Sequence, residues 1–344
     1  MNRSRIAAVW LLAAAAGLTP AASPAQAPTL NAQLQGDISP THDPVLIREG
    51  AVYHVFSTGL GDGPDRILSH RISRDLVHWE KAAPPLAALP DWATRAIPGA
   101  TNAWAPDISY VGGRYRLYYS VSTFGSNRSA IGLLTSPTLD PARADYGWRD
   151  EGQVVASQRS DDYNAIDPNF LADRDGRHWL ALGSFWSGLK LFALNPATGK
   201  PLKPGAAPIA IARRPAPASA PAPVEAPFLI DHGGWYWLVA SYDYCCKGAA
   251  STYYTVVGRS RAITGPYLGK DGSAMLQGGG TILLRADLPE KQRFRGPGHA
   301  GHLRDADGSD YLVYHAYDRQ EQGRPTLRIA RLRWGADGWP VAEQ

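Results

Sequence analysis

The sequence predicts an all-β protein, and three observations support this fold class. Short runs of alternating aromatic and β-branched residues recur along the chain, whereas apolar residues at helical spacing are hard to find. The 344 residues include 35 glycines and 28 prolines, enough to end many short strands. Aromatic residues make up 10% of the chain and charged residues 19%, which argues against a disordered chain, a coiled coil or a helical repeat.

The strand-like runs fall into five similar units of roughly 60 residues each. A first strand starts beside a carboxylate or a histidine, and we expect these strands at residues 42–47, 105–110, 166–171, 224–230 and 296–303. After a polar turn comes a second strand, at residues 52–56, 115–119, 178–182, 235–239 and 311–315. A third strand follows at residues 66–70, 129–134, 189–193, 254–258 and 327–330.

Each unit therefore forms a meander of about four antiparallel strands, and such units arranged radially form a β-propeller. We predict a single-domain, five-bladed β-propeller that covers residues 28–344. Because the first strand of each blade lines the axis of a propeller, the repeat gathers one set of polar side chains at the centre: Asp43, Asp107, Asp167, Glu225, His299 and His302.

Residues 195–223 are rich in proline and alanine, a composition that is typical of a linker between domains. The repeat resumes after this segment. We therefore expect a long connection between two blades of one domain.

Residues 1–27 have the pattern of a secretory signal peptide. Arg3 and Arg5 precede an apolar stretch at residues 6–18, and Ala25-Gln26-Ala27 offers a cleavage site. We expect a secreted or periplasmic protein that has no membrane attachment after cleavage; an uncleaved anchor is the alternative. The formal charge is +4, two units of which belong to Arg3 and Arg5, and no lysine- and arginine-rich run exists, so nucleic acid is not expected as a partner.

The only two cysteines are adjacent, Cys245 and Cys246. They can form a disulfide with each other or stay reduced, but they cannot join distant strands. A redox role in catalysis is not expected, because the chain has no C-x-x-C motif.

A central group of carboxylates is suited to glycoside hydrolysis. That reaction needs one acid to protonate the leaving oxygen and a carboxylate that activates water or attacks carbon. Trp104 and Trp186 are the aromatic residues best placed to stack on sugar rings, although most aromatic residues of the chain are expected in the core.

Several motifs together resemble the endo-arabinanases, five-bladed propellers of glycoside hydrolase family 43. The matching segments are Asn102–Tyr110 (NAWAPDISY), Tyr118–Ser126 (YYSVSTFGS), Tyr163–Pro168 (YNAIDP), Gly183–Lys190 (GSFWSGLK), Glu225–Phe228 (EAPF), Tyr242–Gly248 (YDYCCKG) and Tyr314–Asp318 (YHAYD). The resemblance covers residues 36–340. It implies an enzyme that cleaves α-1,5-linked L-arabinan with inversion at the anomeric carbon.

The resemblance also implies roles for individual residues. Asp43 corresponds to the general base, Glu225 to the general acid and Asp167 to a third carboxylate that orients the acid and raises its pKa. His315 corresponds to a ligand of a central ion, usually calcium, that is held largely through water; no organic cofactor is implied. Asp107 is not expected to be catalytic. Together with Trp104, the expected substrate contacts are Gly125, Asn164, Ala165, Ile166, Ser184, Phe185 and Trp186.

Three alternatives stay open at this stage. An exo-acting arabinofuranosidase or β-xylosidase would use the same scaffold, and a propeller that binds arabinan without cleaving it is a non-enzymatic reading.

His302 departs from the family pattern; we favour a packing role for it over a contact with ion or substrate, and the His299-x-x-His302 spacing is a weak zinc signal. We expect a monomer.

Overall fold

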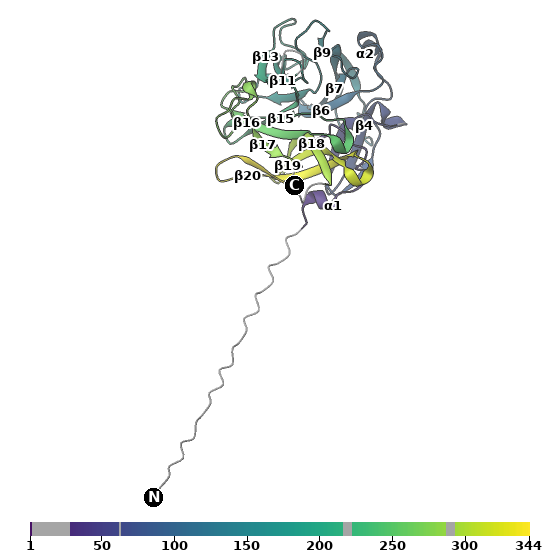
Figure 1. The fold of residues 1–344 in the computed structure, drawn as a ribbon. Coiled ribbons are helices and arrows are strands. Elements are labelled where there is room, and N and C mark those ends of the chain that lie inside the picture. The colour runs from purple at the N-terminus through teal and green to yellow at the C-terminus, as the bar shows by residue number, and fades with distance from the viewer. Residues whose placement is uncertain (2–27, 62, 216–221, 287–292) are drawn as a thin grey trace.

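The computed structural model describes Met1 and residues 28–61, 63–215, 222–286 and 293–344 (Figure 1). The predicted signal peptide, apart from Met1, lies outside the described residues. Within the described ranges, no helix is both long and apolar enough to cross a membrane.

The strands form five sheets, one after another along the chain. The first contains β1 (Gln35–Gly36), β2 (Val45–Glu49), β3 (Val52–Thr58), β4 (Leu68–Ser73) and β5 (His78–Lys81). The second contains β6 (Trp104–Val111), β7 (Arg114–Val121), β8 (Ser129–Ser136) and β9 (Arg149–Ser157). The third contains β10 (Asn169–Ala172), β11 (His178–Leu182), β12 (Leu189–Leu194) and β13 (Ile209–Ala212).

The fourth sheet contains β14 (Val224–His232), β15 (Trp235–Tyr242), β16 (Tyr254–Ser260) and β17 (Thr281–Leu284). The fifth contains β18 (Phe294–Arg304), β19 (Asp310–Asp318), β20 (Arg324–Trp334) and β21 (Pro340–Glu343). The helical elements are short: α1 (Leu30–Gln33), α2 (Asp91–Ala96), η1 (Pro64–Arg66), η2 (Gly248–Ala250), η3 (Met275–Gln277) and η5 (Arg319–Glu321).

These sheets are the blades of a propeller, and the predicted fold is confirmed. The first strands β2, β6, β10, β14 and β18 contact one another in a closed ring. A hydrophobic cluster fills the space between each pair of adjacent blades, including the pair formed by the fifth and the first blade. Burial between blades therefore holds the ring together.

Several details differ from the prediction. Strands β2 and β10 begin at Val45 and Asn169, three residues later than expected, because backbone bends at Asp43 and Asp167 precede them. Strand β4 begins at Leu68, because Pro64–Arg66 forms the 3₁₀ turn η1 ahead of it. The proline- and alanine-rich stretch is not only a connection: Ile209–Ala212 forms β13, the outer strand of the third blade, which pairs with β12.

The N-terminal segment closes the ring between the fifth and the first blade. Strand β1 adds to β5 as a parallel neighbour, and the Leu327 backbone N–H donates to the carbonyl oxygen of Ile38. Helix α1 packs against β20, so that the purple and yellow ends of the chain meet in Figure 1.

A backbone bend recurs in every blade, just ahead of β2 and β10 and inside β6, β14 and β18. At this bend, one non-glycine residue in each blade has a left-handed φ, which is uncommon for such residues: Asp43 (53°), Ala105 (43°), Asp167 (58°), Ala226 (56°) and His299 (51°). A proline follows four of these residues and disfavours the right-handed helical conformation at the bend. The bends lie at equivalent places around the axis, which brings the candidate residues together.

Candidate active site

The bends are tied from blade to blade by backbone N–H groups. In four blades the N–H of the bend residue donates to a side chain of the second strand in the preceding blade. The pairs are Asp43 to His315 Nδ1 (3.1 Å), Ala105 to Thr58 Oγ1 (2.8 Å), Asp167 to Ser120 Oγ (3.0 Å) and His299 to Ser241 Oγ (2.9 Å). In the remaining blade the Ala226 N–H donates to Asp167 Oδ2 (3.2 Å). His315 thus occupies the place that serine or threonine has in other blades.

Asp43 is buried and surrounded by hydrogen-bond donors. Its Oδ1 lies 2.7 Å from His42 Nδ1 and 3.0 Å from His299 Nδ1, and its Oδ2 accepts from the hydroxyl of Thr58 at 2.6 Å. Burial alone would raise the pKa of this carboxyl, but the charges and hydrogen bonds of His42 and His299 outweigh burial and hold the pKa well below its usual range. Asp43 is therefore set to be ionised.

Glu225 is also buried, but its surroundings act in the opposite direction. Burial raises its pKa, and the hydrogen bonds from Ser184 and Tyr253 offset this rise only in part. The Ser184 hydroxyl donates to Oε2 at 2.7 Å. Glu225 is therefore set to hold a proton at a pH where an ordinary carboxyl has lost it.

Asp167 is buried as well, and its pKa is shifted in the same direction as that of Glu225. Burial raises its pKa well above the usual range, and the charges of Glu225 and Asp43 raise it further against the opposing effect of His299. Its bond to the N–H of Ala226 fixes the backbone directly after Glu225. The structure thus brings Asp43, Asp167 and Glu225 into one interacting group.

His299 belongs to this group, although the sequence analysis gave it a central position and no role. Burial would lower its pKa, but the charge of Asp43 and its hydrogen bond, together with the charges of Asp167 and Glu225, raise the pKa to about 9. Its imidazolium is the positive charge among three carboxyls. Thr58 and Tyr253 were also missed, and aligning the ends of the second strands would have found Thr58.

The predicted substrate contacts divide into buried and accessible positions. Asn164, Ala165 and Ile166 are buried directly ahead of Asp167, and Asn164 Oδ1 accepts from the hydroxyl of Ser129 at 2.6 Å. These three residues fix the loop that delivers Asp167.

The other predicted contacts lie in loops and strand ends. Ser184 bonds Glu225, and the next two residues, Phe185 and Trp186, are partly exposed with left-handed φ values. Trp104 is partly exposed and its indole N–H donates to Asn102 Oδ1 (2.9 Å), while Gly125 is exposed in a turn.

Asp107 and His302 have partners of their own. The Asp107 carboxylate accepts from Asn169 Nδ2 (3.0 Å) and from the Phe170 N–H (2.8 Å), so it ties two first strands together. Burial, first among the causes, raises the pKa of Asp107 to about 6. His302 Nε2 lies 2.8 Å from Asp310 Oδ1, and the described part of the chain offers no metal-ligand cluster that includes His302.

His315 is the residue expected to hold a central ion. Its ring is fully buried, and burial holds its pKa well below the usual range, so the imidazole is neutral. Nδ1 accepts the Asp43 N–H, which leaves the ring hydrogen on Nε2, and no group among the described residues bonds that atom. The N–H group at Nε2 of His315 fits a hydrogen bond to a water molecule, through which the ring could contact an ion.

The donor set around His315 is nitrogen-rich for a hard cation. The ligand atoms of His42, Asp43 and His315 lie within 4.8 Å of one another. They supply two nitrogens and one carboxylate, whereas calcium takes six to eight oxygens. The residues fit a hard cation only if water completes its shell.

Comparison with known proteins identifies the family. A model described as glycosyl hydrolases family 43 matches residues 38–340. The chain is 44% identical over 300 residues to the extracellular endo-α-(1→5)-L-arabinanase 1 of Bacillus subtilis, covering 87% of this chain and 86% of that protein. It is 42% identical over 310 residues to the extracellular exo-α-(1→5)-L-arabinofuranosidase of Cellvibrio japonicus, covering 88% and 86%.

A solved structure of an arabinanase is also similar to this chain. The Cellvibrio cellulosa α-L-arabinanase complexed with arabinohexaose matches with a TM-score of 0.82 at 41% identity, and the match covers 89% of this chain and 96% of that one. The resemblance noted in the motifs is confirmed: the chain belongs to glycosyl hydrolases family 43.

Proposed function

We propose that this chain is an exported glycoside hydrolase that cleaves α-1,5-linked L-arabinan by a single displacement with inversion, and that it attacks bonds within the polymer. The observation that carries the proposal is the pair of opposite pKa shifts, low at Asp43 and high at Glu225, in one buried group. Two carboxyls whose surroundings separate their pKa values in this way are suited to general base and general acid roles.

In the proposed reaction, ionised Asp43 takes a proton from a water molecule whose oxygen attacks the anomeric carbon. The glycosidic C–O bond breaks on the opposite face, and protonated Glu225 gives its proton to the leaving oxygen. Asp167 orients Glu225 through the N–H of Ala226. Asp43 ends protonated and Glu225 ionised, and exchange with solvent restores both.

The substrate class rests on the relatives. An endo-arabinanase, an exo-arabinofuranosidase and an arabinanase complexed with arabinohexaose share similar sequences or structures with this chain. Their names favour arabinan as the polymer. We favour endo action; an exo-acting enzyme on the same scaffold is the second candidate, because the two curated relatives differ little in identity to this chain.

We further propose a monomer that is secreted or periplasmic, in line with the word extracellular in the names of two relatives. His315 would hold a central cation, calcium or a similar hard ion, through water. When bound, that ion supplies a positive charge on the propeller axis.

The first test is substitution of the two main carboxyls. Glu225→Gln and Asp43→Asn should each lower the cleavage of debranched arabinan by about a hundredfold or more, because each removes one half of general acid–base catalysis. Asp145→Asn, which changes an acid paired with Arg143 on the surface, is the matched control and should keep wild-type activity. Circular dichroism checks that each variant is folded. Wild-type activity in Glu225→Gln would refute the assignment of the acid.

Product analysis separates the remaining candidates. Purified protein on linear arabinan, with xylan in a parallel reaction, should release oligomers of mixed length. A single small product would favour the exo-acting candidate, products from xylan alone would favour a xylosidase, and binding without products would indicate a non-catalytic propeller.

A further inference from the structure

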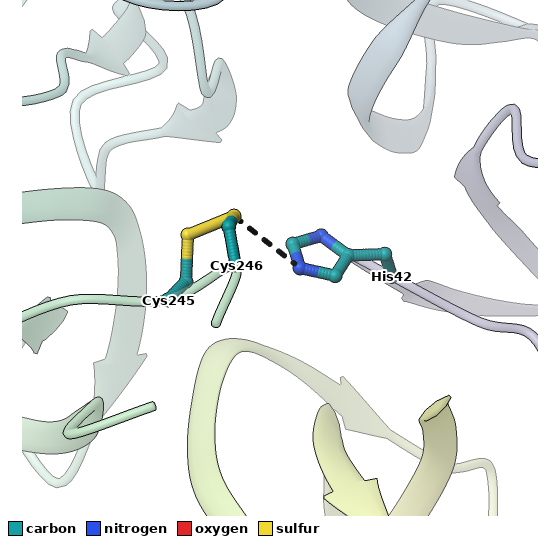
Figure 2. Close-up of side chains that lie close together, drawn as sticks. All are labelled: His42, Cys245 and Cys246. Atoms are coloured by element: carbon teal, nitrogen blue, oxygen red, sulfur yellow. Dashed lines mark hydrogen bonds between the residues drawn. A yellow bond between two sulfur atoms is a disulfide. The ribbon is translucent and has the colours of Figure 1, made fainter. Parts of the chain in front are cut away.

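The two adjacent cysteines are bonded to each other and lie at the edge of the candidate active site. Figure 2 shows the Cys245–Cys246 disulfide beside the His42 ring, with Cys246 Sγ 3.9 Å from His42 Nε2. The pair sits in the loop between β15 and η2, and Cys246 itself is exposed and has a left-handed φ of 63°. Hydrogen bonds such as Lys247 N–H to Ser251 Oγ hold the rest of the loop, whereas the disulfide restricts the backbone of the two cysteines directly.

A continuous line of hydrogen bonds runs from this loop to the candidate base. The Cys246 backbone N–H donates to the Tyr317 hydroxyl oxygen at 2.8 Å. The same hydroxyl lies 2.7 Å from His42 Nε2, and His42 Nδ1 lies 2.7 Å from Asp43 Oδ1. Tyr317 is buried, so its hydroxyl has no free access to solvent.

The first donor sets the direction of the others. Because the Tyr317 oxygen already accepts the Cys246 N–H, its single hydrogen is available for His42 Nε2. With Nε2 facing the Tyr317 hydroxyl, His42 Nδ1 carries the hydrogen that is donated to Asp43 Oδ1. This arrangement keeps Oδ1 of Asp43 hydrogen-bonded and fixes the orientation of the carboxylate.

We propose that the Cys245–Cys246 disulfide is a positioning element for Asp43: the bonded pair holds the Cys246 N–H on Tyr317, Tyr317 holds His42, and His42 holds the carboxylate that activates water. The proposal rests on the proposed function, because it assigns Asp43 the role of base. It gives the paired cysteines a purpose that does not require them to touch substrate.

Reduction is the change that tests the proposal. A dithiol reductant such as dithiothreitol breaks the S–S bond by exchange, leaves two cysteine thiols that carry the two protons, and departs as its own cyclic disulfide. No other group in the chain reacts in this way, since the chain has only two cysteines. The backbone of the two cysteines then loses the constraint of the S–S bond, and the hydrogen bond from the Cys246 N–H to Tyr317 is no longer held in place by it.

The expected result concerns kcat rather than KM. Reduced wild-type protein should show kcat on debranched arabinan lowered about tenfold, less than the hundredfold that a misplacement of 1 Å can cause, with KM nearly unchanged. Reoxidation should restore kcat. A thiol count with Ellman's reagent on denatured samples verifies the redox state before each assay.

Variants then locate the effect. The double variant Cys245→Ser/Cys246→Ser should have the low kcat and no response to reductant. Tyr317→Phe removes the hydroxyl that links loop and imidazole, so it should also lower kcat, and combining it with the cysteine changes should add little, as expected for residues of one network. Tyr311→Phe is the matched control on the same strand β19; it should keep wild-type kcat and full sensitivity to reductant.

The outcomes separate this proposal from the proposed function. If oxidised wild type does not cleave arabinan, the proposed function fails. If it does cleave arabinan but fully active protein contains two free thiols, or reduction lowers only the melting temperature while kcat stays constant, the positioning role is overturned. Additive effects of Tyr317→Phe and the cysteine changes would overturn it as well.

Discussion

Three carboxyls of the same chemistry behave differently in this site because their nearest neighbours differ. Two imidazole nitrogens, from His42 and His299, contact the same oxygen of Asp43. Glu225 has only neutral hydroxyl donors, from Ser184 and Tyr253. Burial acts on both in the same direction, so the imidazoles decide which acid ionises. The two imidazoles beside Asp43 therefore separate its role from that of Glu225.

Ser184 provides a test of this balance at the level of one residue. Its hydroxyl stabilises ionised Glu225 and so lowers the pKa that burial raises. Activity needs protonated Glu225, so the alkaline limb of the kcat/KM profile follows the pKa of this group in the free enzyme. Ser184→Ala removes the donor, raises the pKa of Glu225 and should move the alkaline limb to higher pH. The measurement is kcat/KM on a soluble arabino-oligosaccharide across the pH range.

Ser187→Ala is the control for this measurement. Ser187 lies in the same loop, but its hydroxyl donates to Asp162 at the surface. Its profile should match wild type. An alkaline limb that stays in place, or moves to lower pH, in Ser184→Ala would show that Glu225 does not set it.

The sequence placed the carboxyls well and their partners poorly. Asp43, Asp167 and Glu225 stand at repeated positions of first strands, so spacing alone was enough to expect them at one centre. The contact of His299 with Asp43 crosses from the fifth blade to the first, and such a contact depends on the angle between blades. Thr58 and Tyr253 bond Asp43 and Glu225 within their own blades, but they lie outside the first strands whose repeat was recognised. The opposite ionisation of Asp43 and Glu225 depends on these contacts and could not be predicted from the strand pattern.

Among the first strands of the blades, β18 departs most from regular pairing, and its irregularity serves the site. Its register against β19 shifts twice, on either side of Gly298, next to the bend at His299. A Cβ atom at Gly298 would lie 2.1 Å from the ring of Tyr253, so only glycine fits against that ring. Tyr253 in turn bonds Glu225. Strand β18 thus fixes His299 through its own backbone. It also fixes Tyr253, because Gly298 packs closely against the ring of that residue.

Gly298→Ala should therefore affect both stability and catalysis. Overpacking of this kind costs about 1–3 kcal/mol of unfolding free energy, and displacement of Tyr253 should also lower kcat. Gly147→Ala is the control, because no atom lies near its added methyl group; its unfolding free energy should stay within about 0.5 kcal/mol of wild type. Denaturant unfolding and arabinan assays measure the two effects. Wild-type kcat in a destabilised Gly298→Ala would mean that Tyr253 has no part in catalysis.

Strand composition located the first three strands of each blade but none of the outer strands. The second and third strands are aromatic and β-branched, and all of them were found. Strand β13 escaped prediction because its four residues lie inside a proline- and alanine-rich stretch that has the composition of a linker. It forms because β12 presents an open edge, a tertiary cause that the local sequence does not contain.

The whole molecule depends on how the ring closes. Each blade consists of strands that follow one another in sequence, so no strand is exchanged between the first and the last blade. Closure relies on the cluster between these blades and on the N-terminal segment, which reaches from β5 across to β20. The sequence predicted five blades, but it did not indicate that the residues after the predicted signal peptide would close the ring.

Asn31 is the side chain on which this closure can be tested. It is buried; its Oδ1 accepts the Ile329 N–H at 2.8 Å and its Nδ2 donates to the Tyr314 hydroxyl at 2.9 Å, so α1 is bonded to two strands of the fifth blade. Asn31→Ala leaves the Ile329 N–H buried without this acceptor, which costs about 1–3 kcal/mol. We expect the melting temperature to fall by several degrees while kcat stays at the wild-type value, because neither partner of Asn31 touches the acidic group.

Gln33→Ala in the same helix, whose amide donates only to nearby carbonyls at the surface, should leave the melting temperature unchanged. Equal melting temperatures for the two variants would show that the cluster between the blades closes the ring without help from α1.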